Sequence, residues 1–194
     1  MREGLGLHHL LPAAEALLLD RLGFDPRRLV AEARTLGDLK HPGIPDLYAY
    51  FSEGGHNYLV MEYIDGMQLA TLMDRCVALG VHLPTALVAY VGAEVGAGLG
   101  YAHSMTDPEG RSMGVVHRDV KPSNVIFVNG VPKLADIGLV ATVDDSQSIV
   151  GTEGYLPPEG PGSVPADLFS LGKMLYEICT GNNRLEFPRL PQNL

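Results

Sequence analysis

Residues 117–124 read His-Arg-Asp-Val-Lys-Pro-Ser-Asn, and the triplet Asp136-Ile137-Gly138 begins twelve residues after Asn124. Taken singly, most of these residues are typical of turns, because Asp, Asn, Pro and Ser are common in loops. Together they make the densest cluster of chemically capable side chains in the sequence. The cluster therefore indicates one functional site, and the rest of the chain is interpreted around it.

The types of residue in this cluster suit phosphoryl transfer. In that reaction the protein mainly positions an acceptor hydroxyl and balances the charge on phosphate oxygens. Asp119 can accept and orient the hydroxyl, and Lys121 can neutralise charge on the transferred group. Asn124 and Asp136 offer two oxygen ligands at the ends of a short predicted hairpin, which suits Mg²⁺ held jointly with phosphates.

The surrounding sequence predicts a mixture of strands and helices. Two hairpins are expected, one from 46–52 and 58–64 and one from 125–128 and 132–135, each around Gly- or Asn-containing turns. Helices are expected over 27–40, 67–79, 84–104 and 167–179. Residues 1–26 are expected to be a helical or loop-rich lead-in, and 136–158 a functional loop. Four glycines in the third helix indicate close packing against a neighbour: Gly92, Gly96, Gly98 and Gly100.

Composition limits the class of protein. A chain of 194 residues with 46% hydrophobic residues can form one globular domain with a sizeable core. The formal net charge of −9 argues against a nucleic-acid partner. The only cysteines, Cys76 and Cys179, are too few and too far apart for a disulfide framework, and no apolar run is long enough to cross a bilayer. A cytoplasmic location is expected.

With these motifs in place, the chain resembles the protein kinase family, specifically the eukaryotic-like serine/threonine kinases of bacteria. The family's pattern H-R-D-x-K-P-x-N matches residues 117–124, and its D-x-G matches 136–138. Residues 151–159 resemble the segment that ends in Ala-Pro-Glu, 58–66 the last N-lobe strand and the hinge, and 167–172 the start of the central C-lobe helix. The resemblance covers about residues 29–181.

The resemblance implies an α+β, protein-kinase-like fold in a single incomplete domain. Residues 1–64 would form a reduced N-lobe, and residues 65–194 an incomplete, mainly helical C-lobe. Asp119 would be the catalytic base, Lys121 a phosphate contact, and Asn124 and Asp136 the ligands of Mg²⁺ beside bound ATP. Further implied roles are nucleotide contacts at Glu62, Ile64 and Ile126, a gatekeeper at Met61, a regulatory-helix glutamate at Glu32, and a packed column of Leu36, Leu47, His117, Ile137 and Asp167.

The sequence departs from the family pattern at both ends. The family carries a glycine-rich loop and a strand lysine before Glu32, whereas residues 1–31 contain no lysine and only the fragment Gly4-Leu5-Gly6. At the other end, the sequence provides no residues for the last C-lobe helices. Glu159 is therefore expected to be a buried carboxylate without its partner, and the helix at 167–179 to expose apolar surface. A shortened or fragmentary open reading frame, or a domain completed by another chain, would explain the departures at both ends.

Two main functions of different classes follow, beside a third, a small-molecule phosphotransferase of the same broad fold, against which Lys121-Pro122 and the segment 151–159 argue. The first is a protein serine/threonine kinase homologue that transfers the γ-phosphoryl of ATP to a Ser or Thr hydroxyl of a protein substrate. The second is a non-catalytic kinase-like interaction module, a pseudokinase or fragment, since the missing lysine and glycine loop should weaken nucleotide binding. We expect a catalytic lineage with little activity in the isolated chain. Thr142, Ser146 and Ser148 are candidate phosphoacceptors, whereas His8, His9, His56 and His103 are expected to be solvated or packed without a specific partner.

Overall fold

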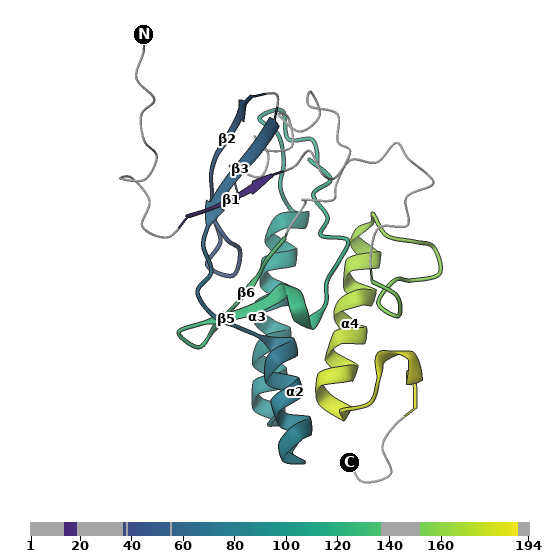
Figure 1. Ribbon diagram of the computed structural model, residues 1–194. Helices are drawn as coiled ribbons and strands as arrows, with labels where there is room; N and C mark the ends of the chain where they lie inside the picture. The colour runs from purple at the N-terminus through teal and green to yellow at the C-terminus, as the bar shows by residue number, and fades with distance from the viewer. Residues whose placement is uncertain (1–13, 19–36, 38, 55, 137–151, 190–194) are drawn as a thin grey trace.

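The computed structural model describes residues 14–18, 37, 39–54, 56–136 and 152–189. Within these residues, a small antiparallel sheet lies at one end, and three α-helices, a second small sheet and two short 3-10 helices lie beside it (Figure 1). The elements in chain order are β1 (Ala14–Leu18), β2 (Leu47–Glu53), β3 (His56–Glu62), β4 (Met67–Gln68), α2 (Leu69–Leu79), α3 (Thr85–His103), η3 (Pro122–Asn124), β5 (Val125–Val128), β6 (Val131–Leu134), α4 (Val164–Thr180) and η4 (Arg184–Glu186).

The first sheet has the order β1-β3-β2 and confirms the predicted hairpin. Strands β2 and β3 pair antiparallel from Leu47↔Met61 to Glu53↔His56, across a turn in which Gly54 has a φ of +61°. The prediction for the lead-in was wrong for Ala14–Leu18, which forms strand β1 and pairs with β3. An apolar run of this length fits a helix or a strand. The open edge of β3 decides the outcome, because it offers backbone partners to an extended segment.

The main core lies where the helices meet the second sheet. Helix α3 packs against both α4 and β6, and the most deeply buried side chains on these elements include Val91, Leu99, Leu134 and Met174. The predicted helices at 84–104 and 167–179 are confirmed as α3 and α4, and that at 67–79 as α2 after the short strand β4. The helix expected at 27–40 lies mostly outside the described residues.

Two of the α3 glycines explain how closely its neighbours approach. A Cβ on Gly92 would lie 3.1 Å from Leu175 Cδ2 of α4, and one on Gly98 would lie 3.6 Å from Ile44 Cγ1. Gly100 has nothing within 4 Å of its Cβ position, so for this glycine the prediction of close packing was wrong.

The second sheet, of order β4-β5-β6, places the predicted site next to the segment that leaves β3. Strands β5 and β6 form the predicted hairpin in the register Val125↔Leu134. Gly66 lies against β5 so closely that a Cβ there would be 2.3 Å from the Phe127 carbonyl oxygen. Only glycine permits this approach, which brings the end of the first sheet onto the strand that follows Asn124.

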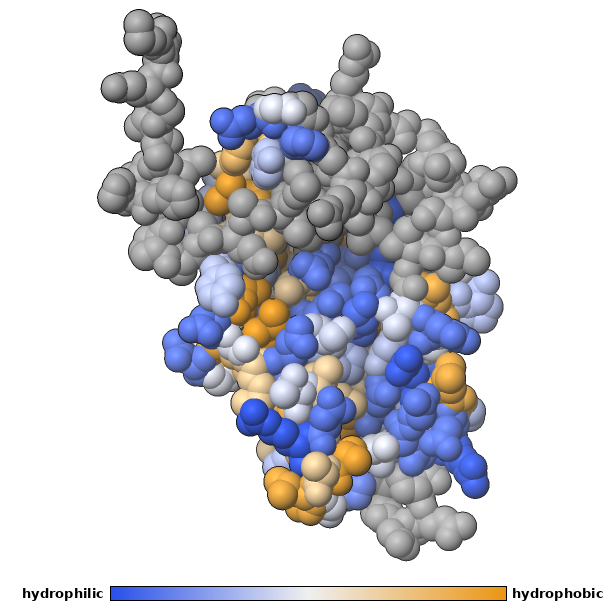
Figure 2. All heavy atoms as spheres, in the orientation of Figure 1, coloured by the Kyte–Doolittle hydropathy of each residue, from blue (hydrophilic) through white to orange (hydrophobic). Residues whose placement is uncertain are grey.

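The exposed apolar side chains of the helical layer include those at the end of α2 and two on α4. Val77, Leu79 and Val81 are exposed at the C-terminal end of α2, and apolar atoms gather at the lower end of the face in Figure 2, where Figure 1 places the end of α2. Leu168 and Phe169 are exposed on α4, as expected.

Glu159 is exposed rather than buried, so its carboxylate carries no desolvation cost and the expectation of a buried carboxylate was wrong. Within the described residues, none of the helices combines the length and the apolar character needed to cross a bilayer.

Candidate active site

One buried carboxylate anchors the loop that carries the candidate catalytic residues. Asp167, only 1% exposed in helix α4, accepts hydrogen bonds from the backbone N–H of His117 and of Arg118, each 2.7 Å long. Arg118 has a φ of +72°, a left-handed conformation that is unfavourable for a residue with a Cβ. The two charge-assisted bonds to Asp167 hold the backbone in this conformation, which turns the chain toward Asp119.

His103 completes the anchor and was missed by the sequence analysis. Its Nε2 lies 2.8 Å from Asp167 Oδ2, and its side chain is 10% exposed. The expectation that His103 lacks a specific partner was therefore wrong. His103 lies on α3 and Asp167 on α4, and the two residues are 64 positions apart in sequence. Only the packing of the two helices reveals the pair.

The imidazole of His117 connects the loop to the second hairpin. Its Nδ1 accepts a hydrogen bond from the Asp119 backbone N–H (3.2 Å), so its Nε2 is the nitrogen that donates to the Ala135 carbonyl oxygen (2.8 Å). Burial lowers the pKa of His117, and this outweighs the opposing effects of the Ala135 hydrogen bond and of the nearby carboxylates. The ring is therefore neutral at physiological pH. Its two hydrogen bonds hold the backbone at Asp119 and the backbone at Ala135 in fixed positions relative to each other.

Asp119, Lys121, Asn124 and Thr152 form one network. Asp119 Oδ2 lies 2.5 Å from Lys121 Nζ and accepts a hydrogen bond from Asn124 Nδ2 (3.1 Å). Its Oδ1 accepts from the Thr152 hydroxyl (2.9 Å), which in turn accepts from Lys121 (2.8 Å). Partial burial favours the neutral acid, but the bonds from Lys121 and Thr152 outweigh it and hold the pKa of Asp119 below its ordinary value. Asp119 is thus ionised at neutral pH.

The two oxygens of Asp119 are not equally occupied. Oδ2 has two donors in this network, whereas Oδ1 has one, and a carboxylate oxygen can accept two hydrogen bonds. An incoming hydroxyl would therefore find its acceptor site at Oδ1, beside Thr152.

The candidate metal ligands Asn124 and Asp136 are at the same end of the β5-β6 hairpin. Asn124 directly precedes Val125, which pairs with Leu134, and its backbone oxygen accepts from Ala135 N (2.8 Å). Asn124 Nδ2 also donates to the Asp119 backbone oxygen (2.8 Å), which leaves the amide oxygen as the atom able to bind a cation. Asp136 has a φ of +63° and an exposed side chain. An amide oxygen and an open carboxylate are a donor set that fits Mg²⁺ shared with phosphates.

The residues expected to contact the nucleotide lie in the segment between the sheets. Glu62 ends β3; its backbone N–H donates to the Asp46 oxygen (2.7 Å), and its carboxylate forms an ion pair with Lys133 of β6 (2.7 Å). Ile64 follows two residues later and is half-buried. Ile126 lies on β5 opposite Gln68, with its Cγ2 close to Gly66. The Glu62–Lys133 pair ties this segment to the hairpin that carries Asn124.

The remaining positions of the family pattern lie partly within the described residues. Strand β1, with the sequence Ala-Glu-Ala-Leu-Leu, contains no lysine or arginine. Within the expected column, His117 and Asp167 are buried and joined by a hydrogen bond, and Leu47 is half-buried. Several expected positions lie outside the described residues: His8, His9, Glu32, Leu36, Ile137, Thr142, Ser146 and Ser148.

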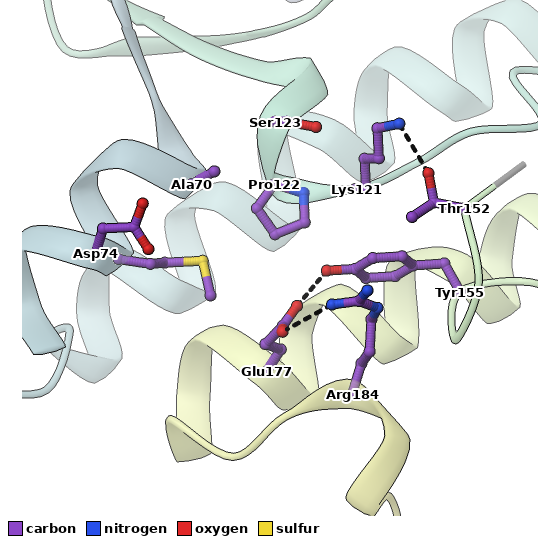
Figure 3. A pocket seen from close by; sticks show the side chains of 10 residues that line it. Ala70, Asp74, Lys121, Pro122, Ser123, Thr152, Tyr155, Glu177 and Arg184 are labelled. Atoms are coloured by element: carbon purple, nitrogen blue, oxygen red, sulfur yellow. Dashed lines mark hydrogen bonds and ion pairs between the residues drawn. The ribbon is translucent and has the colours of Figure 1, made fainter.

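A groove beside Lys121 was not foreseen from the sequence. It is lined by residues of α2, of the loop at 121–123, of the turn at 152–155 and of α4 and η4 (Figure 3). On its floor the Tyr155 hydroxyl donates to the Glu177 carboxylate, and Arg184 lies over the Tyr155 ring. Burial and the contact with Glu177 raise the pKa of Tyr155, so it remains a donor. The sequence signal for this groove was Glu177, an acidic residue within the otherwise apolar helix expected at 167–179.

Comparison with known proteins agrees with this geometry. A family model described as "Protein kinase domain" matches residues 20–189. The chain belongs to the protein kinase family. It is 36% identical over 165 residues to serine/threonine-protein kinase PknL of Mycobacterium tuberculosis, covering 80% of this chain and 38% of PknL. It is 37% identical over 169 residues to serine/threonine-protein kinase PknB of Mycobacterium leprae, covering 79% of this chain and 25% of PknB.

A probable serine/threonine-protein kinase of Clostridium perfringens, CPE1738, is 32% identical over 165 residues, with 80% of this chain and 22% of that protein covered. The chain thus spans less than two fifths of each of these three relatives. The predicted family and the α+β protein-kinase-like fold are confirmed, and the chain is a serine/threonine kinase homologue.

Proposed function

We propose that this kinase homologue transfers the γ-phosphoryl group of ATP to a Ser or Thr hydroxyl of a protein. The single observation that carries the proposal is the Asp119 network, in which an ionised carboxylate is held by Lys121, Thr152 and Asn124 with one acceptor site left on Oδ1. The names of the relatives favour this function over that of a non-catalytic module.

In the proposed reaction Asp119 receives the proton of the acceptor hydroxyl. The hydroxyl oxygen forms a bond to the γ-phosphorus, the bond from that phosphorus to the bridging oxygen breaks, and ADP leaves. Lys121 balances charge near the transferred group. Asn124 and Asp136 would hold Mg²⁺, which neutralises phosphate oxygens when bound. Glu62, Ile64 and Ile126 would contact the nucleoside.

The same proposal includes the arrangement of the domain and its location. In this proposal residues 1–64 would form a reduced N-lobe and residues 65–194 a partial C-lobe, with the boundary between the end of β3 and the start of β4. We also propose a cytoplasmic location, where the thiols of Cys76 and Cys179 would stay reduced. The proposed partners are ATP and a protein substrate.

The test is phosphate incorporation into a generic Ser/Thr protein acceptor with Mg²⁺ and ATP. Wild type should label the acceptor at the low rate expected of the isolated chain, and Asp119→Asn should lower that rate by ~100-fold or more, the usual contribution of a general base. Glu109→Gln, a remote exposed acid-to-amide change, is the matched control and should keep the wild-type rate. Equal labelling by wild type and Asp119→Asn would refute the proposal.

Nucleotide titration separates the kinase from the non-catalytic alternative. Because β1 supplies no basic residue, the affinity for ATP should depend on Mg²⁺ at Asn124 and Asp136. We expect calorimetry to detect ATP binding with Mg²⁺ and much weaker binding after chelation. Absence of binding in both conditions would favour the interaction module.

A further inference from the structure

The groove of Figure 3 lies where the neighbours of an acceptor residue would bind. It has a volume of about 280 Å³, and Lys121 and Thr152, two of its walls, are the residues that hold Asp119. Successive residues of an extended chain are ~3.3 Å apart, so a segment whose hydroxyl reaches Asp119 places a nearby side chain in this groove. The groove can therefore select among acceptor sequences.

The groove contains a carboxylate that would attract a basic side chain. Glu177 projects from α4 with a side chain that is 12% exposed, and a carboxylate so placed forms strong charge-assisted hydrogen bonds with a guanidinium or ammonium group. Asp74 of α2 also lines the groove, but its side chain is exposed, and water screens its attraction for a cation. Glu177 is thus the group that would decide the preference.

The guanidinium group of Arg184 already lies beside the Glu177 carboxylate. Arg184 Nη1 lies 3.5 Å from Glu177 Oε1, its Nε donates to the Glu153 backbone oxygen (2.9 Å), and its Cζ lies 4.7 Å from the centre of the Tyr155 ring. Figure 3 shows Arg184 and Tyr155 both directed at Glu177. Three separate contacts fix the guanidinium in this position.

The turn at 152–155 is shaped around this side chain. Gly154 has a φ of +87°, and a Cβ there would lie 2.9 Å from both Cγ and Nε of Arg184. Because Gly154 has no side chain, the Arg184 side chain can pass beside it and reach Glu177. The backbone conformation and the three contacts therefore agree on one placement of the arginine.

We propose that Arg184 is a specificity-determining residue, which neutralises Glu177 from within and prevents the groove from selecting basic side chains beside the acceptor. This inference rests on the proposed kinase function, because that function places an acceptor segment in the groove. Removing the guanidinium opens Glu177 to an arginine or lysine of the bound segment. The unmodified protein accepts neutral and basic neighbours alike.

The test measures binding of fluorescent peptides by anisotropy, with no dependence on phosphate transfer. Peptide pairs contain one acceptor serine and differ only by Arg or Gln at each flanking position in turn. Wild type should bind the two members of each pair within about twofold. Arg184→Gln should bind the Arg peptide of at least one pair ~10-fold more tightly, which corresponds to ~1.4 kcal/mol. Arg189→Gln, which removes the same charge from an exposed position, should behave as wild type.

The double variant Glu177→Gln with Arg184→Gln should lose the gain, since the carboxylate is then absent. A tenfold wild-type preference for Arg peptides would overturn the inference, and so would an unchanged preference in Arg184→Gln or a lack of binding by every peptide. If circular dichroism shows Arg184→Gln to be unfolded, Arg184→Met keeps the aliphatic packing over Tyr155 and replaces it. Discrimination in binding without phosphate transfer would contradict the proposed activity alone; transfer without discrimination would contradict only the role of Arg184.

Discussion

Replacing Asp167 by Asn tests whether one buried carboxylate holds the catalytic loop in place. The substitution keeps the size of the side chain and removes the negative charge. In the native structure the two oxygens serve three donors: the backbone N–H groups of His117 and Arg118 and the ring of His103. Asparagine has one oxygen, and its NH₂ group must then face at least one donor.

The expected loss of stability follows from these contacts. A buried donor left without an acceptor costs ~1–3 kcal/mol, and the remaining bonds lose their charge assistance, worth ~1 kcal/mol each. We therefore expect Asp167→Asn to lower the free energy of unfolding by ~3–5 kcal/mol, the range for breaking a buried charged contact. Domains are stable by only ~5–15 kcal/mol, so the variant should be close to its stability limit.

The assay is urea unfolding followed by far-ultraviolet circular dichroism, because the sequence contains no tryptophan. Asp74→Asn is the matched control: the same chemical change at an exposed position of α2, expected to alter stability by less than ~0.5 kcal/mol. A loss below ~1 kcal/mol for Asp167→Asn at an unchanged m-value would show that the three donors find other partners, and the proposed anchor would be wrong.

Four other substitutions test three separate parts of the structure by the same unfolding assay. Lys133→Met should cost ~1–2 kcal/mol, because it leaves the partly buried Glu62 carboxylate without its ion pair; no loss would show that the pair is dispensable. His117 has a lowered pKa when folded, so the unfolded state binds more protons: its contribution is present above pH 6.5 and is lost as pH falls below 6.5, by up to ~1.4 kcal/mol per unit, and His117→Asn should flatten this slope. Gly66→Ala should destabilise by more than ~1 kcal/mol through its clash with β5, whereas Gly100→Ala should stabilise by ~0.5–1 kcal/mol, and equal effects would contradict the packing described.

The parts of the site that could be predicted are those specified by local sequence. Asp119, Lys121 and Asn124 lie within six residues of one another, and Asp136 follows at the far end of a hairpin that alternation and a turn already indicate. Their spacing restricts them to one region whatever the remaining chain does. The network at Asp119 is therefore close to what the sequence implied, apart from the contribution of Thr152.

The features that were missed depend on contacts between distant segments. Ala14–Leu18 becomes a strand because the edge of β3 accepts it, and no periodicity within five residues reveals that edge. His103 gains Asp167 only when α3 packs on α4, and Arg184 reaches Glu177 only because the turn at Gly154 leaves room. Each of these pairings is set by tertiary packing, which overrides what composition suggests for the isolated segment.

The two tasks of a phosphotransferase are supported unevenly by the described residues. The groups proposed for chemistry, Asp119, Lys121 and Asn124, are held by a partly buried network that ends at the buried carboxylate of Asp167 in α4. The groups proposed for nucleotide binding are backbone and apolar atoms between the two sheets, tied by one ion pair at Glu62, with no basic residue on β1. The proposed contacts to the nucleoside therefore lie apart from the Asp119 network, and Asn124 takes part in both tasks through the proposed Mg²⁺ site. Substitutions can weaken ATP binding while the Asp119 network stays intact, and loss of affinity is not by itself a sign that the catalytic geometry is lost.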